Sequence, residues 1–233
     1  MTAPRLAEPS DAEAPLRRGA VAEFLGTGLL VAVIVGSGIA AARLSPYDQG
    51  LQLLESSVAT ALGLFAIIAL FGPISAHINP VITLAALVLG PRWSPARSAV
   101  TVVSQCAGAV GGALLANAMF GVAQGVATTA RASAETILAE IVATAGLVLL
   151  VFVLVRTGRA GLVAPAVGAY IGAAYWFTSS TSFANPAVTL GRVFSDTFAG
   201  IEPGSAVAFV TAQLVGGAVG VLLTLLLVPK GRP

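Results

Sequence analysis

The chain is short of charged residues, which make up only 9% of its 233 residues. Soluble domains carry roughly 25% charged residues, so this chain has too few to cover a surface that faces water. Hydrophobic residues make up 57% and the mean hydropathy is +0.93, which together predict a membrane protein. The net charge is +2 and the basic residues are scattered, so no nucleic-acid partner is expected.

The chain also has only one cysteine and one histidine. A lone Cys106 cannot close a disulfide within the chain, and we expect it to be a small packing residue. One cysteine and one histidine provide no metal-ligand cluster. We therefore expect no metal, no cofactor and no catalytic residue, and the chain is not predicted to be an enzyme.

Hydrophobic runs are abundant. A membrane-spanning helix needs about 20 mostly apolar residues. Six segments qualify, namely residues 20–42, 51–71, 98–120, 135–155, 162–180 and 204–228. Two shorter apolar pieces, 79–89 and 185–194, would cross half a bilayer, and both begin with Asn-Pro, a pair suited to a helix N-terminus. The predicted fold class is an all-α membrane protein with six transmembrane helices and two re-entrant half-helices.

The order of polar residues within the apolar segments occurs twice. Glu23, Asn79-Pro80 and Gln105 are followed by Glu140, Asn185-Pro186 and Gln213. Residues 20–120 and 135–229 therefore form two repeats within one channel domain, 20–229. Each repeat has three spans, so the copies must have opposite orientations, and a site is expected near the midplane where they meet.

Residues 1–19 lack the apolar run of a signal peptide, and we expect a disordered cytoplasmic tail. Six spans put both termini on one side of the bilayer. Nine Lys and Arg residues on that side, against three on the other, place the termini in the cytoplasm and the protein in the cell (plasma or inner) membrane. The nine are Arg5, Arg17, Arg18, Arg92, Arg97, Arg156, Arg159, Lys230 and Arg232, and the three are Arg43, Arg131 and Arg192.

The paired Asn-Pro sequences predict a constriction for uncharged solutes. The half-helices would point their positive N-terminal ends at one central point, where the amides of Asn79 and Asn185 can donate to a solute. The preceding stretches, 72–78 and 178–184, can offer a ladder of carbonyl acceptors, because irregular backbone at this depth must line a cavity or be buried. This arrangement favours a neutral hydrogen-bonding molecule and repels a cation.

Glu23 and Glu140 lie within apolar spans, where a carboxylate is costly. We expect each to accept hydrogen bonds from the re-entrant backbone of its own repeat, and proton coupling is the alternative. His77 is predicted to be a scaffold residue, with a pH-sensitive gate as the alternative. Gln105 and Gln213 are expected to brace the third and sixth spans, since an amide is poorly tolerated against lipid.

The sequence resembles the aquaporin and aquaglyceroporin superfamily (major intrinsic proteins) over nearly all of the chain after the tail. The resemblance rests on AEFLGTG at 22–28, SAHINPVIT at 75–83 and FANPAVT at 183–189. It implies a homotetramer with one passive pore per subunit. The family constriction would comprise Asn79, Pro80, Val81, Asn185, Pro186 and Ala187.

The narrow external filter of the family departs from its usual pattern here. The family normally has an arginine directly after the second Asn-Pro-Ala. Val188 occupies that position here, and the nearest arginine is Arg192. The other filter positions correspond to Thr60, Ser182 and Ala173, although gap placement can move the last to Ala174 or Tyr175. The aromatic, histidine and arginine that are usual in water-selective members are not evident, so a wider, uncharged opening is expected.

The leading hypothesis is a channel for neutral solutes such as metalloid hydroxides, glycerol and water. Residues 169–186 resemble a bacterial branch associated with arsenic resistance, which implies arsenite and methylated arsenicals as solutes. A mainly water-selective channel is the first alternative and would need Arg192 or Tyr175 to rebuild a narrow ring. An ion-coupled secondary transporter, with Glu23 and Glu140 as coupling groups, is a more remote alternative.

Overall fold

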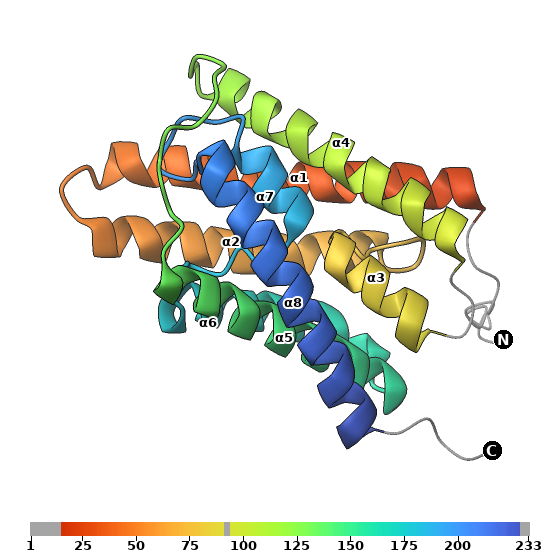
Figure 1. Ribbon diagram of the computed structural model, residues 1–233. Helices are drawn as coiled ribbons and strands as arrows, with labels where there is room; N and C mark the ends of the chain where they lie inside the picture. Colours follow the sequence, from red (N-terminus) through yellow and green to blue (C-terminus); the bar gives the residue numbers. More distant parts are fainter. Residues whose placement is uncertain (1–14, 91–93, 229–233) are drawn as a thin grey trace, which may run out of the picture.

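Six long apolar helices and two short ones make up the bundle (Figure 1). The computed structural model describes residues 15–90 and 94–228. The long helices are α1 (Leu16–Leu44), α2 (Gln49–Phe71), α4 (Pro95–Met119), α5 (Ala134–Arg156), α6 (Val163–Phe177) and α8 (Pro203–Leu227). A single 3₁₀ turn, η1 (Ala160–Leu162), precedes α6, and the short helices are α3 (Pro80–Leu89) and α7 (Pro186–Arg192). The predicted fold class is confirmed.

Helix ends differ from the predicted limits by a few residues. α1 begins at Leu16, so residues 16–19 are helical and do not belong to the predicted tail. Residues 1–14 lie outside the described residues, as do Arg5, Arg92, Lys230 and Arg232 from the charge comparison. α6 ends at Phe177, three residues before the predicted end, and the chain from Thr178 leads into the bundle as non-helical backbone.

Both short helices start at their Asn-Pro pair. The side-chain oxygen of Asn79 accepts a hydrogen bond from the Val81 backbone at 2.9 Å. The oxygen of Asn185 accepts bonds from Ala187 and Val188 at 3.0 and 3.3 Å. Proline occupies the first helical position in each case, where no backbone donor is needed. The same local chemistry therefore begins a helix twice in the interior of the bundle.

The two repeats pack in the same way. α1 packs against α4, and α5 packs against α8, which crosses it in Figure 1; α3 and α7 contact helices of both pairs. The long helices approach closely at glycine: a Cβ at Gly108 would lie 2.2 Å from the Phe24 carbonyl oxygen. One at Gly216 would lie 2.5 Å from the oxygen of Ile141. These contacts bring the helix backbones together in each repeat.

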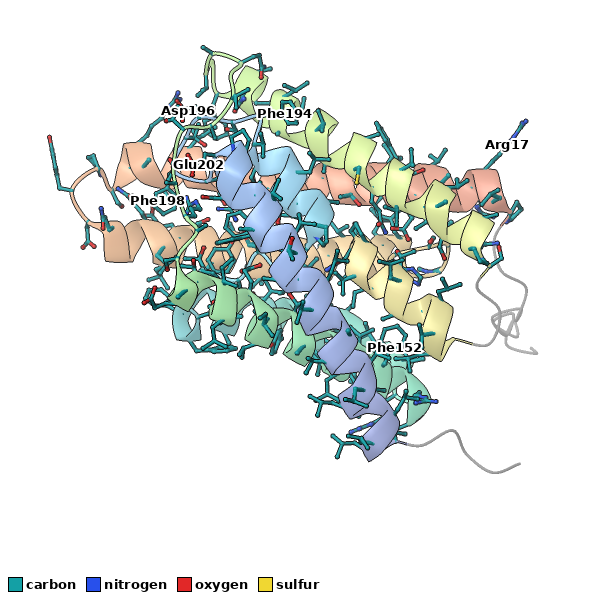
Figure 2. The ribbon with its side chains drawn as sticks, in the orientation of Figure 1. Arg17, Phe152, Phe194, Asp196, Phe198 and Glu202 are labelled. Atoms are coloured by element: carbon teal, nitrogen blue, oxygen red, sulfur yellow. The ribbon has the colours of Figure 1, made fainter. Side chains whose placement is uncertain are left out.

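The bundle has two ends, which we call inner and outer. α1 begins and α8 ends at the inner end, on the right in Figure 1. Figure 2 labels Arg17 at this end, and Asp196, Phe198 and Glu202 at the opposite, outer end. α7 begins in the interior and runs outward to Arg192, which lies next to the 193–202 connection.

Candidate functional site

A cavity of about 1020 Å³ runs through the bundle from the inner end towards the outer end. One side of its wall is apolar and comes from α1, α2, α5 and α6, through side chains such as Leu30, Leu64 and Leu147. The other side is irregular backbone, from residues 72–78 and 182–184. Asn79 and Asn185 also line this cavity. A pore with one apolar and one polar side suits a solute that carries both carbon and hydroxyl groups.

The two asparagines meet across the interface between the repeats. The amide nitrogen of Asn79 donates to the Ala184 carbonyl at 2.8 Å, and that of Asn185 donates to the Ile78 carbonyl, also at 2.8 Å. An amide group has two N–H donors, so each asparagine keeps one for the cavity. The structure thus brings the Asn-Pro pairs together at one point, as the inverted repeat predicts.

Glu23 is fully buried and holds the first re-entrant stretch. Its carboxylate accepts bonds from the Ser75 hydroxyl at 2.5 Å and from the backbone N–H groups of His77 and Ile78 at 2.8 and 2.7 Å. A fourth bond, at 2.8 Å, comes from the amide of Gln105. These donors satisfy a buried charge that would otherwise be costly.

Glu140 holds the second stretch with the same set of donors. It accepts bonds from the Ser180 hydroxyl at 2.6 Å and from the backbone of Phe183 and Ala184 at 2.9 Å each. The Gln213 amide donates to it at 2.6 Å. The four contacts repeat those of Glu23, so one local design supports both walls of the constriction.

The backbone just before each asparagine is strained. Ile78 has φ of 49° and Ala184 has φ of 45°, in the left-handed region that residues other than glycine rarely adopt. Thr181 and Ser182 also have positive φ, at 60° and 51°. The carboxylates bind the N–H groups of Ile78 and Ala184, and the opposite asparagines bind their carbonyls. These bonds fix a conformation that would otherwise relax.

The remaining residues of the predicted constriction begin the short helices or pack in the interior of the bundle. Pro80 and Pro186 open the two short helices. Val81 is buried, and its side chain fills the space beside Gly217 of α8 rather than the cavity. Ala187 is also fully buried. His77 lines the cavity, and its Nδ1 lies 3.2 Å from the hydroxyl of Thr83.

Thr60, Ser182 and Val188 line the outer part of the cavity, as their predicted filter positions require. All three are buried. The Thr60 hydroxyl lies 3.1 Å from the phenol oxygen of Tyr175, which joins α2 to the neighbouring helix α6 beside the cavity. The Ser182 hydroxyl is buried and finds no partner among the described residues, so it is free to bond with a passing solute.

Of the three positions predicted for the fifth span, Ala173, Ala174 and Tyr175, only Tyr175 lines the cavity. Ala173 is exposed on the outside of the bundle and does not line the cavity, whereas Ile171 and Tyr175 do. Successive residues of an α-helix are about 100° apart, so residue 173 faces nearly opposite to residue 171, while residue 175 returns to the same face. Tyr175, one of the three predicted positions, is therefore the one that presents its side chain to the cavity, and it brings an aromatic ring there.

Val188 keeps arginine out of the predicted filter position, but an arginine does line the cavity farther out. Arg192 follows Val188 by one helical turn and therefore shares its pore-facing side, and it lines the outer end of the cavity. Its Cζ lies 3.4 Å from the centre of the Phe183 ring, and its Nε donates to the Ala199 carbonyl. The four-residue spacing from Val188 was the sequence signal for this placement.

Arg131 is a second arginine near the opening, and sequence reasoning did not find it. It belongs to the 120–133 connection between α4 and α5. Its Nε and Nη2 donate to the carbonyls of Gly200 and Phe198, at 2.6 Å each. No motif marks this residue, because its position depends on how a long irregular connection crosses the outer end.

The chain is similar to known proteins over most of its length. Residues 11–182 match the family model described as major intrinsic protein. Aquaglyceroporin AqpS of Rhizobium meliloti (strain 1021) is 43% identical over 223 residues, covering 95% of this chain and 94% of the relative. Aquaporin TIP1-2 of Zea mays is 34% identical over 188 residues, covering 75% and 73%.

A solved structure shares the fold. The aquaglyceroporin from Plasmodium falciparum superposes with a TM-score of 0.69 and covers 90% of this chain and 94% of its own. Its sequence is 21% identical, so this likeness speaks to the fold alone.

Proposed function

Because this chain belongs to the major intrinsic protein family, and is a multi-pass membrane channel for small solutes, we propose that it passes neutral molecules of polyol size as well as water. Members of the family are channels and not enzymes. The proposed solutes are glycerol and the neutral hydroxides of metalloids, such as arsenous acid and methylated arsenicals. The constriction would be formed by the Asn-Pro pairs and the selectivity ring by Thr60, Tyr175, Ser182 and Val188.

The observation that carries this proposal is the buried Val188 in the ring. A neutral side chain of this size leaves room where the family's usual arginine would extend into the pore. The polar groups left there are hydroxyls and carbonyls, which exchange hydrogen bonds with a solute's hydroxyl groups. Opposite them, the apolar wall accommodates the carbon or metalloid centre. The aquaglyceroporin relative, at 43% identity, supports glycerol as one solute.

Arsenite and its methylated forms are the finer part of the proposal. Their neutral hydroxides present hydroxyl groups around a compact centre, much as glycerol does. Support for them comes from the resemblance of residues 169–186 to the arsenic-resistance branch. The Ser182 hydroxyl and the carbonyls of 182–184 would serve these solutes as they serve glycerol.

Substitution of Val188 tests this proposal. Val188→Arg should lower glycerol and arsenite permeation of proteoliposomes by about tenfold or more, because a guanidinium would fill and charge the ring. Water permeation should fall much less. Stopped-flow light scattering measures water and glycerol, and arsenic content after filtration measures arsenite. Val188→Met is the matched control, since it adds length without charge. Unchanged glycerol and arsenite fluxes in Val188→Arg would refute the ring assignment.

A mainly water-selective channel is the second candidate, and one observation favours it. The hydrogen bond between Thr60 and Tyr175 fixes a phenol ring in the wall of the cavity, and Arg192 also lines that cavity. Under this alternative the wild-type protein passes water with no measurable glycerol or arsenite. Tyr175→Ala would then create glycerol permeation that the wild type lacks. Glycerol flux in the wild type decides in favour of the broad channel.

An ion-coupled transporter has less support. Its coupling groups would be Glu23 and Glu140, and a coupling carboxylate must gain and lose a proton during transport. Each of these carboxylates accepts four hydrogen bonds from donors that also hold the re-entrant backbone, so a change in its bonding during transport would disturb the constriction itself. A scaffold role for both, braced by Gln105 and Gln213, is therefore the proposal. Solute accumulation against its gradient, driven by a pH difference, would contradict it.

The family resemblance supports two further proposals about the assembled protein. It would form a homotetramer with one pore per subunit. It would lie in the cell membrane with its inner end, and therefore both termini, in the cytoplasm.

A further inference from the structure

Valine at position 188 removes positive charge from the selectivity ring, and this raises the question of how the channel rejects cations. A wide neutral ring admits partly hydrated ions more easily than a narrow charged one. The described residues that line the cavity include one positively charged side chain at its outer end, Arg192. The inner end has Arg97, beyond the constriction.

Arg192 is fixed in a pore-facing position. It is 5% exposed, its guanidinium lies on the Phe183 ring, and Nε bonds to the Ala199 carbonyl. The terminal nitrogens make no bond to the described residues, so they remain directed to the space that Arg192 lines. One turn of α7 separates Arg192 from Val188, which corresponds to about 6 Å along the helix axis. A charge here is outside the ring and does not occupy it.

Arg131 adds a second charge at the same place. It approaches the Phe183 ring to 5.7 Å and is held by the Gly200 and Phe198 carbonyls. Arg131 and Arg192 both line a small space of about 30 Å³ on the outer side of Tyr175. Arg192 also lines the main cavity, so an ion at the outer end of that cavity would lie near both guanidinium groups.

Neither arginine is paired directly with a carboxylate among the described residues, although the charge of Glu140 acts on Arg192 from a longer distance. Their hydrogen bonds go to backbone carbonyls. Two like charges at short range within a protein cavity repel a cation more strongly than they would in bulk water. They leave the energy of a neutral solute nearly unchanged.

We propose that Arg192 and Arg131 form an outer charge barrier that excludes cations, so that the neutral ring at Val188 can be wide. Size selection and charge selection are then made at two successive levels of the pore. Phe183 is a positioning residue, because it holds the Arg192 guanidinium against the pore wall. This inference rests on the proposed function, which supplies the wide neutral ring.

The test combines cation leak and neutral flux in the same proteoliposomes. Removing both charges, in Arg131→Met with Arg192→Met, should raise proton and K⁺ leak about tenfold or more, since the repulsion disappears. Proton leak is followed with an internal pH dye under a K⁺ diffusion potential, and K⁺ leak with an internal K⁺ dye. Glycerol flux should stay within about twofold of the wild type, because the ring is unchanged.

Three further variants separate charge from structure. Arg192→Lys keeps the charge and should keep leak low. Adding Val188→Arg to the double variant should restore cation exclusion and reduce glycerol flux. Arg43→Met is the matched control: Arg43 is an exposed arginine of the outer end that lies over the Phe120 ring and bonds to the Phe120 carbonyl, away from the cavity. Its removal should leave the leak at the wild-type level.

The outcomes distinguish the two proposals. Normal glycerol flux with an unchanged leak in the double variant overturns the charge barrier and leaves the proposed function intact. A wild type that passes water and no glycerol overturns the proposed function, whatever the leak. Equal leak in Arg43→Met and the double variant would also overturn the barrier, because position in the pore would then not matter.

Discussion

Glu23 and Glu140 are the residues on which the interior of the channel depends most directly. Each is fully buried and accepts two backbone bonds from a stretch with left-handed residues. Their side chains therefore stabilise the shape of the pore wall as well as the fold. A neutral amide in their place has one acceptor oxygen and turns an N–H group towards donors that it cannot satisfy.

Replacing one of these carboxylates should weaken the protein strongly. Glu140→Gln is expected to cost about 3 kcal/mol, because two charge-assisted bonds are lost and a buried donor is left unpaired. Thermal unfolding in detergent measures the effect. Glu135→Gln is the control, on an exposed residue in the first turn of the same helix. Equal unfolding temperatures for Glu140→Gln and Glu135→Gln would contradict the bracing role.

Sequence reasoning reached some residues of the site and missed others for physical reasons. Glu23 and Glu140 could be identified because a carboxylate in an apolar span needs a partner. The choice among Ala173, Ala174 and Tyr175 could not be made from the sequence, because a shift of two residues along a helix reverses the face. Arg131 could not be predicted, since a long connection without regular structure has no periodicity from which to infer its path.

At the scale of elements, the close packing of α1 against α4 depends on Gly108 of α4. The α4 helix alone would be at least as stable with alanine there. A Cβ at Gly108 would lie 2.2 Å from the Phe24 carbonyl oxygen, which is backbone and cannot rotate away. Gly111, three residues later on α4, has no neighbour within 4 Å of such a Cβ. The two positions form a natural pair for comparison.

Alanine at these two positions should have opposite effects. Gly108→Ala should force the helices apart and destabilise the protein by about 3 kcal/mol, the upper end for overpacking. Gly111→Ala should be neutral or stabilising by up to about 1 kcal/mol, because alanine favours helix. Size-exclusion profiles and thermal unfolding in detergent give the comparison. If Gly108→Ala is as stable and monodisperse as Gly111→Ala, the close packing is wrong.

The short helices were the elements that the sequence predicted best. Proline at the first position and asparagine before it leave few alternatives to a helix start, and an apolar run of half-bilayer length sets the extent. The ends were less certain: α7 stops at Arg192, two residues before the predicted end, and α1 starts four residues early. Helix ends depend on tertiary contacts that a local pattern does not contain.

For the whole molecule, the distribution of arginine predicts its direction in the membrane. The outer end should face the exterior. In a Cys106→Ser background, which removes the one native thiol, Tyr47→Cys should react with a membrane-impermeant maleimide on right-side-out vesicles. Tyr47 is fully exposed at the outer turn between α1 and α2, and Arg17 is exposed at the inner end.

Arg17→Cys is the matched variant and should react only after the vesicles are opened. Labelling of Arg17→Cys in closed vesicles, with Tyr47→Cys protected, would mean that the molecule is inverted. The charge count would then have failed as a guide to its orientation.

The reciprocal bonds of Asn79 and Asn185 make assembly of the constriction depend on both repeats. Each repeat supplies the carbonyl that the asparagine of the other repeat needs. Neither half of the chain can therefore form the constriction alone. We expect the constriction to form only after the second half has been synthesised. The constriction is therefore completed in the same step in which the two repeats dock against each other.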